Sequence, residues 1–382
     1  MEFQYTRVFD YRPLDGARAA GIAIRKAFGF SLGKPIRTFF GTRPPELVDV
    51  KVGAGLTEQV PWGALEVPGL EGVVLHLTST FKPDYGKVFQ VVVTGPRKHR
   101  FRIEGLMELI ERELQTNSIY RGQAIDGSDP PEFLDLSSVD PEAVVYTQDV
   151  MRQLEANVWS PIKHADSLAL LGQPGKRSVL FEGPYGSGKT LGAYLTAQVA
   201  VANGWTLVYC RPGKDDIDTV MQTAVIYQPS VVFVEDLDTI AGADVGTIDH
   251  HARVLDMFDG LKSKGLRMLL VLTTNHADKL HKAMLRPGRL DALIHVAEMD
   301  EPGVERMVRR TVGDALDPET DFSKVFEAVQ GFMPAFVKEA IDRAVRYSVS
   351  IHDGRLGGIG TTELVLAAEG LRPQLELMAG AG

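Results

Sequence analysis

Eight residues decide the fold of this chain: Gly183-Pro184-Tyr185-Gly186-Ser187-Gly188-Lys189-Thr190. They match the pattern G-x-x-x-x-G-K-[ST] at every position, and this pattern binds nucleotide phosphates when a strand precedes it and a helix follows it. The flanking residues meet that condition, because Ser178–Phe181 is typical of a buried strand and Leu191–Ala202 of a helix. We therefore expect all eight residues to form a phosphate-binding loop.

The chemistry of the loop follows from its residue types. Its glycines let the backbone curl, so that successive N–H groups point at phosphate oxygens. The helix that begins near Lys189 adds the positive end of its dipole. Lys189 is expected to reach the β- and γ-phosphates of a nucleotide, and the Thr190 hydroxyl is expected to bind Mg²⁺. ATP and Mg²⁺ are therefore the predicted ligands.

Strands and helices alternate after the loop. Thr206–Cys210, Ser230–Val234 and Met268–Thr273 are predicted strands, and Asp216–Tyr227 and His251–Phe258 are predicted helices. Such alternation predicts an α/β fold, in which helices cover both faces of a parallel sheet.

The chain has 382 residues, enough for two or three domains. The stretch 46–103 is β-rich, a helix is predicted over about 104–117, and Gly122–Pro131 has the composition of a linker. From residue 301 the pattern is helical, with segments near 303–312, 321–329, 334–348 and 361–369. We predict a β-rich α+β N-terminal domain with its linker (1–138), a large α/β domain (139–300) and a small helical domain (301–382).

Polar residues follow two of the predicted strands. Glu235 and Asp236 end one strand, and Asn275 ends another. The carboxyl ends of strands in an open α/β sheet face the ligand, so these side chains should lie beside the phosphate loop. One acid is expected to hold Mg²⁺ and the other to orient and deprotonate the attacking water. Asn275 is expected to bind that water or the γ-phosphate.

Two arginines flank a Pro-Gly step in Arg286-Pro287-Gly288-Arg289. Guanidinium groups suit phosphate recognition, and an arginine at a γ-phosphate is worth about 10³–10⁵ in rate. The alternative is a surface ion pair with Asp278 or Asp291.

Composition excludes several other functions. The net charge of −9 argues against a sequence-independent nucleic-acid binder, and the basic run Pro96–Arg102 is predicted to be a solvated strand edge or turn. Cys210 is the only cysteine, so an intramolecular disulfide and a cysteine-based zinc cluster are excluded. His76 and His99 are interpreted as ordinary strand residues. No apolar run is long enough to span a membrane, so a cytoplasmic location is expected.

Several ordered motifs together resemble the AAA clade of the AAA+ ATPases. The similar stretches are LEANVWSPIKHADSLALLGQPGKRSVLFEGPYGSGKT, LTTNHADKLHKAMLRPGRLD and VQGFMPAFVKEAIDRAV, within about residues 139–370. The resemblance implies a P-loop AAA+ core with a small helical lid domain, and rings of usually six copies with ATP between subunits. It also implies that Lys189, Thr190, Glu235 and Asp236 act in cis, that Asn275 is the first sensor, and that Arg286 and Arg289 act in trans.

Two features depart from the pattern of that clade. Its usual order at the end of the acid-bearing strand is Asp then Glu, whereas this chain has Glu235 then Asp236. Carried over by position, Glu235 is the magnesium-side acid and Asp236 the base. In unfoldases of the clade, a loop with an aromatic–aliphatic–Gly step grips an extended peptide. The loop at that position in this chain is Arg211–Asp216, and it has no aromatic residue. Both departures are similar to the mitochondrial translocator of the folded Rieske protein, although that protein begins with a membrane helix and this chain does not.

The leading hypothesis is an ATP-driven ring that remodels or translocates a protein substrate. The N-terminal domain is expected to recognise cargo or a partner, following the habit of the family. Two alternatives remain open: a nucleic-acid motor or loader, and an ATP-gated scaffold or regulator that hydrolyses little ATP. Salt-sensitive DNA binding would favour the former. Turnover that does not respond to a protein substrate would favour the latter.

Overall fold

The structure is a computed structural model that describes residues 2–29, 36–38, 41–67, 69–137, 140–141, 145–236, 260, 265–276, 289–296 and 298–379. Contacts between residues divide the chain into two units, and each unit draws on segments that are far apart in the sequence. The first comprises Met1–Asp135, Ala200–Val234 and Phe258–Leu270. The second comprises Leu136–Val199, Glu235–Met257 and Val271–Gly382.

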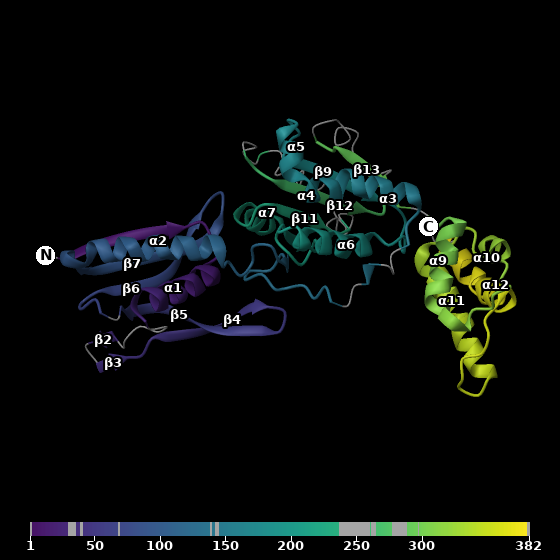
Figure 1. The fold of residues 1–382 in the computed structure, drawn as a ribbon, viewed down its shortest axis with the longest axis horizontal. Helices are drawn as coiled ribbons and strands as arrows, with labels where there is room; N and C mark the ends of the chain where they lie inside the picture. Colours follow the sequence, from purple (N-terminus) through teal and green to yellow (C-terminus); the bar gives the residue numbers. More distant parts are fainter. Residues whose placement is uncertain are drawn as a thin grey trace. The chain divides into compact units, whose positions relative to one another are not determined.

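A five-stranded antiparallel sheet forms most of the N-terminal region, with strand order β1-β7-β6-β5-β4 (Figure 1). Helices α1 and α2 pack together, and α1 contacts β5, β6 and β7. Alternate strand residues such as Leu75, Leu77, Val91 and Val93 are buried, as expected for a sheet covered on one face. The elements are β1 (Glu2–Phe9), α1 (Pro13–Phe28), β2 (Ile36–Thr38), β3 (Gly41–Arg43), β4 (Glu46–Gly53), β5 (Leu56–Glu66), β6 (Val74–Lys82), β7 (Gly86–Pro96), the 3-10 helix η1 (Arg97–His99) and α2 (Arg100–Thr116).

The prediction for the basic run Pro96–Arg102 is wrong in one respect. Its arginines are exposed, as expected, but most of the run forms η1 and the first turn of α2 instead of a strand edge. Pro96 has no N–H to extend the strand, so the chain turns directly into the helix, which then buries Ile103, Leu106 and Met107.

A six-stranded sheet forms the core of the α/β region, with strand order β13-β9-β12-β11-β10-β8. The pairs β13–β9, β10–β11 and β10–β8 are parallel, so the predicted α/β fold is confirmed. Every residue of β10, β11 and β12 is buried. The elements are β8 (Ala124–Asp126), α3 (Gln148–Leu154), the π-helical segment η3 (Glu155–Trp159), α4 (Ser160–Lys163), α5 (Ala165–Leu170), β9 (Lys176–Glu182), α6 (Lys189–Ala202), β10 (Thr206–Cys210), α7 (Ile217–Ile226), β11 (Ser230–Val234), β12 (Met268–Thr274) and β13 (Ala292–His295). The helix predicted over His251–Phe258 lies outside the described residues.

The linker prediction for Gly122–Pro131 is wrong over its first half. Strand β8 lies within this stretch and pairs in parallel with β10, with Ile125 opposite Val208. Ala124, Ile125 and Asp126 are all buried. A strand of three residues gains its stability from the pairing with β10, which local composition does not reveal.

Apart from one isolated bridge between Leu316 and Ile359, the regular elements described in the C-terminal region are helices, as predicted. Its apolar core gathers side chains from all the longer helices, among them Val308, Val325, Ile341 and Leu364. Asp300 caps α9 by accepting from the N–H of Gly303. The elements are α9 (Glu301–Val312), the 3-10 helix η6 (Gly313–Ala315), α10 (Phe322–Ala328), α11 (Pro334–Ile351), α12 (Thr361–Glu369) and α13 (Arg372–Ala379).

Candidate functional site

The predicted phosphate loop lies between β9 and α6. Gly183, Gly186 and Gly188 have φ angles of 157°, 80° and 97°, which residues with a side chain rarely adopt. A Cβ atom on Gly183 would lie 2.0 Å from the carbonyl oxygen of Val296, so no larger residue fits there. The loop therefore needs glycine for both its turns and its packing.

Lys189 places its ammonium group inside the curl of the loop. The Nζ atom donates to the carbonyl oxygens of Gly183 (2.7 Å) and Pro184 (3.0 Å), and to Oδ1 of Asn275 (2.7 Å). The residue is only 7% exposed. A buried cation held by neutral oxygens at the start of a helix is well placed to attract an anion.

Thr190 and Glu235 meet at the first turn of α6. The Thr190 hydroxyl donates to Oε1 of Glu235, although the two residues are 45 positions apart. A hydroxyl and a carboxylate are hard oxygen ligands of the kind that Mg²⁺ prefers. The two side chains therefore fit a magnesium ion beside the phosphate loop.

Asp236 has an unusual backbone conformation for a residue with a side chain, with φ of 41°. Its N–H donates to the Thr273 hydroxyl (2.8 Å), and its Oδ1 accepts from Nδ2 of Asn275 (3.1 Å). Strained backbone of this kind persists only where surrounding contacts hold it, and it concentrates at functional sites.

Asn275 joins the lysine to the aspartate. Its Oδ1 accepts from Lys189 while its Nδ2 donates to Asp236. Only this orientation of the amide satisfies both neighbours, because an ammonium only donates and a carboxylate only accepts. The three side chains, which come from α6 and from the ends of β11 and β12, form one hydrogen-bonded chain, as the sequence predicted they would lie together.

A pocket of about 350 Å³ opens on these residues. Its volume lies in the range of small-molecule sites. The phosphate loop, Asp236 and Asn275 line one side, and residues of the helical region line the other, namely Met307, Pro334, Ala335 and Lys338. Tyr185 is 60% exposed at its rim. Sequence reasoning did not single out the four helical residues, although Pro334, Ala335 and Lys338 lie in the stretch VQGFMPAFVKEAIDRAV that resembles the AAA clade.

Tyr146 is a second residue that the sequence did not indicate. Its hydroxyl donates to the carbonyl oxygen of Gly188 (2.6 Å), inside the phosphate loop. Burial raises the pKa of its phenol, so the group stays protonated and donates. It lies 42 positions before the residue that it contacts, and a lone tyrosine carries no sequence signal.

The arginine pair is only partly described. Arg286 lies outside the described residues. The carbonyl oxygen of Arg289 accepts from the hydroxyl of Ser178, near the start of β9. Ser178 precedes Gly183 by five residues, about 16 Å along a strand, and an arginine side chain spans about 7 Å. The backbone of Arg289 is therefore held near the start of β9, whereas the phosphate loop follows the end of that strand.

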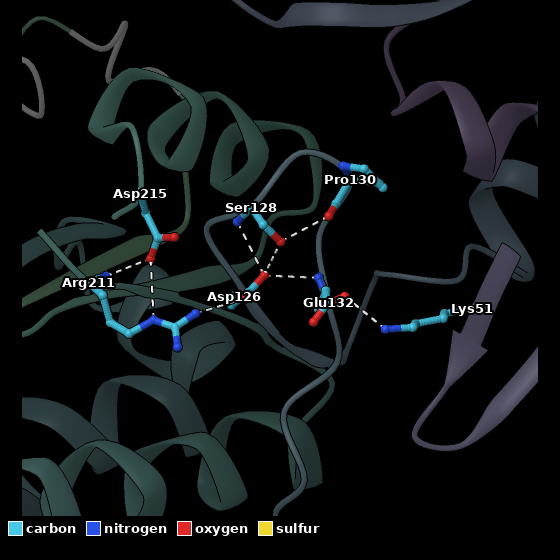
Figure 2. A network of polar contacts seen from close by, with 7 residues as sticks. All are labelled: Lys51, Asp126, Ser128, Pro130, Glu132, Arg211 and Asp215. Carbon is cyan, nitrogen blue, oxygen red and sulfur yellow. Dashed lines mark hydrogen bonds and ion pairs between the residues drawn. The ribbon is translucent and has the colours of Figure 1, made fainter. Parts of the chain in front are cut away.

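The loop that follows β10, Arg211–Asp216, is held at its base (Figure 2). Arg211 donates to Asp126 through Nη2 (2.9 Å), and its N–H donates to Asp215 (2.7 Å). Asp126 also accepts from the N–H groups of Ser128 (3.2 Å) and Glu132 (2.9 Å). These donors hold the pKa of the Asp126 carboxyl below its usual range, although burial opposes them. The loop is thus a fixed turn, and its exposed residues are Gly213, Lys214 and Asp216.

No other chemical site stands out in the part of the chain that the structure describes. That part contains no group of three or more His, Cys, Asp and Glu residues that could hold a metal ion. Cys210 is buried in β10, where burial raises the pKa of its thiol to about 12. Among the described helices, none has the length and apolarity to cross a bilayer.

Comparisons with known proteins match the region that contains these residues. Residues 179–298 match the family model described as "ATPase family associated with various cellular activities (AAA)". A curated relative, Protein CdcH of Halobacterium salinarum, is 30% identical over 216 residues, which cover 52% of this chain and 29% of that protein. The chain thus spans less than a third of the length of that relative. The matched residues include the phosphate loop, both acids, Asn275 and both arginines.

Proposed function

We propose that this chain, whose residues 179–298 match the AAA ATPase family model, is one subunit of a homo-oligomeric ring, of six copies, that hydrolyses ATP to remodel or translocate a protein substrate. The observation that carries this proposal is the row of hydrogen bonds from Lys189 through Asn275 to Asp236. It links a cation suited to phosphate with a carboxylate at a pocket large enough for a nucleotide. We place the boundaries of the three domains at residues 138 and 300.

The phosphate loop holds the triphosphate of ATP. The N–H groups of Gly188, Lys189 and Thr190, at the start of α6, would contact the phosphate oxygens, and Lys189 would leave the loop carbonyls to bind the β- and γ-phosphates. Thr190 and Glu235 hold the magnesium ion. When bound, Mg²⁺ neutralises charge that develops on the phosphate oxygens.

Asp236 is the general base and Asn275 orients the attacking water. A carboxylate that accepts from an amide beside the phosphate site is placed to take a proton from that water. The shorter reach of aspartate relative to glutamate is offset by the φ angle of 41°, which sets the direction of the side chain. Contacts in the structure agree with this assignment, because Glu235 meets Thr190 and Asp236 meets Asn275.

The arginines complete the site of a neighbouring copy. The backbone of Arg289 is held near the start of β9, at the end of the strand away from the phosphate loop, which supports a role for its guanidinium, with that of Arg286, at a nucleotide held by the next subunit. This arrangement makes hydrolysis depend on assembly.

A mixing experiment tests the shared site. One variant, Lys189→Ala, keeps its arginines, and a second, with Arg286 and Arg289 changed to Ala, keeps its phosphate loop. Each alone is expected to lose about 10³-fold in turnover. Mixed before assembly, they should recover a rate well above the sum of the two, because intact loops then meet intact arginines. A mixed rate equal to that sum would refute the shared site.

The choice of a protein substrate rests on the family habit and on the surface of the loop after β10. The exposed tip of this loop carries Lys214 and no aromatic residue. Without an aromatic side chain the loop is poorly suited to grip an extended peptide. This favours movement of folded cargo, in the manner of the Rieske-protein translocator group. The experiment is to measure ATP turnover with and without folded and unfolded candidate proteins. A rise with a folded substrate supports the proposal.

A second candidate is an ATP-gated scaffold. The observation that favours it is the tight fixation of the same loop by Asp126 and Asp215, which leaves it little freedom to act as a moving paddle. A scaffold would change its assembly on binding ATP, and its turnover would not respond to any protein. A nucleic-acid motor would instead show DNA binding that weakens steeply with salt.

A further inference from the structure

Two consecutive residues connect the helical region to the phosphate loop. Val145 is buried in the apolar core of the helical region, together with Val304 and Met307 of α9. Tyr146 turns its side chain the other way and donates to the carbonyl oxygen of Gly188. Its own carbonyl oxygen accepts from Nη2 of Arg306 on α9 (3.2 Å). A single residue is therefore bonded to α9 through its backbone and to the phosphate loop through its side chain.

The bond to Gly188 acts on the peptide that enters α6. The Gly188 carbonyl and the Lys189 N–H belong to one planar trans peptide, so they point in opposite directions. When the Tyr146 hydroxyl holds the carbonyl on one side, the N–H is turned toward the opposite side, where the pocket lies. The carbonyl also accepts from Gly192 (3.1 Å) within the helix. The phenol is thus an additional, lateral restraint on the orientation of this peptide.

Burial makes the restraint stiff. Tyr146 is 6% exposed, and its ring lies 3.5 Å from the position that a Cβ on Gly188 would take. Because the phenol is buried, loss of this bond would leave an unpaired buried hydroxyl, which is costly. The hydroxyl therefore stays on Gly188 as long as Val145 stays in its core.

We infer that Tyr146 is a positioning residue, which orients the Lys189 N–H toward the β-phosphate and couples that orientation to the placement of α9. This inference rests on the proposed nucleotide site and deepens it. Nucleotide that fills the pocket contacts Met307 of α9 as well as the loop. Movement of α9 would displace Arg306 and Val145 and so change the geometry of the hydrogen bond from the Tyr146 hydroxyl to the Gly188 carbonyl.

The test is equilibrium binding of ADP and AMP to the full chain. Tyr146→Phe keeps the ring and removes only the hydroxyl. ADP affinity is expected to fall about five- to tenfold, the effect of one buried hydrogen bond. AMP affinity should change less than twofold, since AMP lacks the β-phosphate. For ATP turnover we expect KM to rise and kcat to stay within about twofold, because the bond is present in the ground state and in the transition state.

Two further variants keep the inference falsifiable. Tyr347→Phe, at a tyrosine of α11 that is 55% exposed, is the matched control and should bind ADP as the unchanged chain does. Arg306→Met should weaken ADP binding in the native background and have no further effect beside Tyr146→Phe, if the two act in series. Equal loss of ADP and AMP affinity, or additive effects of the two variants, would overturn the inference. Failure of the unchanged chain to bind ADP would instead count against the proposed function.

Discussion

Replacement of Asp236 by asparagine separates its chemistry from its structure. Asparagine tolerates the left-handed backbone at least as well as aspartate, so the φ angle of 41° adds no new strain. Its amide oxygen still accepts the 3.1 Å hydrogen bond from Asn275, so the pocket keeps its shape. What disappears is the negative charge and, with it, the proposed general base. A general base contributes about 10²–10⁴ in rate, which is about 3–5 kcal/mol of activation free energy.

Phosphate release and nucleotide affinity together test whether Asp236 is the general base. We expect phosphate release by Asp236→Asn to fall by at least about 10²-fold, while the affinity for a fluorescent ATP analogue stays within about twofold. Asp314→Asn, which removes an exposed acid from η6, serves as the control and should leave both quantities unchanged. Turnover of Asp236→Asn at the rate of the unchanged protein would refute the assignment of the base. A parallel loss of nucleotide binding would show that the residue supports the pocket and not the reaction.

Three further predictions concern stability and fit. Burial raises the pKa of Asp15 from 3.8 to about 6, so the folded state favours the neutral carboxyl. The contribution of this group to the free energy of unfolding is therefore full below pH 3.8 and is lost as the pH rises to about 6. Asp15→Asn should therefore raise stability at pH 7 by up to about 3 kcal/mol and flatten the pH profile of the denaturant midpoint between pH 4 and 6; an unchanged profile would contradict the burial argument. Gly183→Ala should lower nucleotide affinity at least tenfold, since the new Cβ would lie 2.0 Å from the Val296 carbonyl oxygen. The control Gly105→Ala, at a position with open space around it, should leave nucleotide affinity unchanged. Asp126→Ala removes the acceptor of several donors and should lower the free energy of unfolding by about 2 kcal/mol, measured by denaturant unfolding, with faster hydrogen exchange over 126–132. Retained stability would show that the loop after β10 is held by other contacts.

The sequence predicted those parts of the fold that are decided locally. The buried strands β9 to β12 are continuous apolar runs between polar turns, and their residues alone indicate strands. Strand β8 escaped prediction because it has three residues in a stretch rich in Gly, Asp, Ser and Pro, and only its pairing with β10 makes it a strand. Strand β1 was not predicted either, although its residues alternate between exposed and half-buried positions.

The same distinction applies to the site. The phosphate loop is eight consecutive residues, and the polar residues Glu235, Asp236 and Asn275 were found because each ends an apolar strand. The partners that complete the site come from distant positions. Tyr146 precedes Gly188 by 42 residues, and Arg211 follows Asp126 by 85. Nothing in the local pattern of either residue marks a partner, because both contacts exist only after the strands have paired.

The reversed order of the two acids illustrates how backbone geometry assigns roles. Carried over by sequence position, the proposed roles give Glu235 to the magnesium ion and Asp236 to the attacking water. In the folded chain Glu235 uses its extra methylene to reach Thr190, and the positive φ of Asp236 turns the shorter side chain toward Asn275. The anchor for that turn is the hydrogen bond from the Asp236 N–H to the Thr273 hydroxyl, on the neighbouring strand β12. The conformation at the end of β11, and not the order of the acids, therefore determines which carboxylate lies beside Thr190 and which beside Asn275.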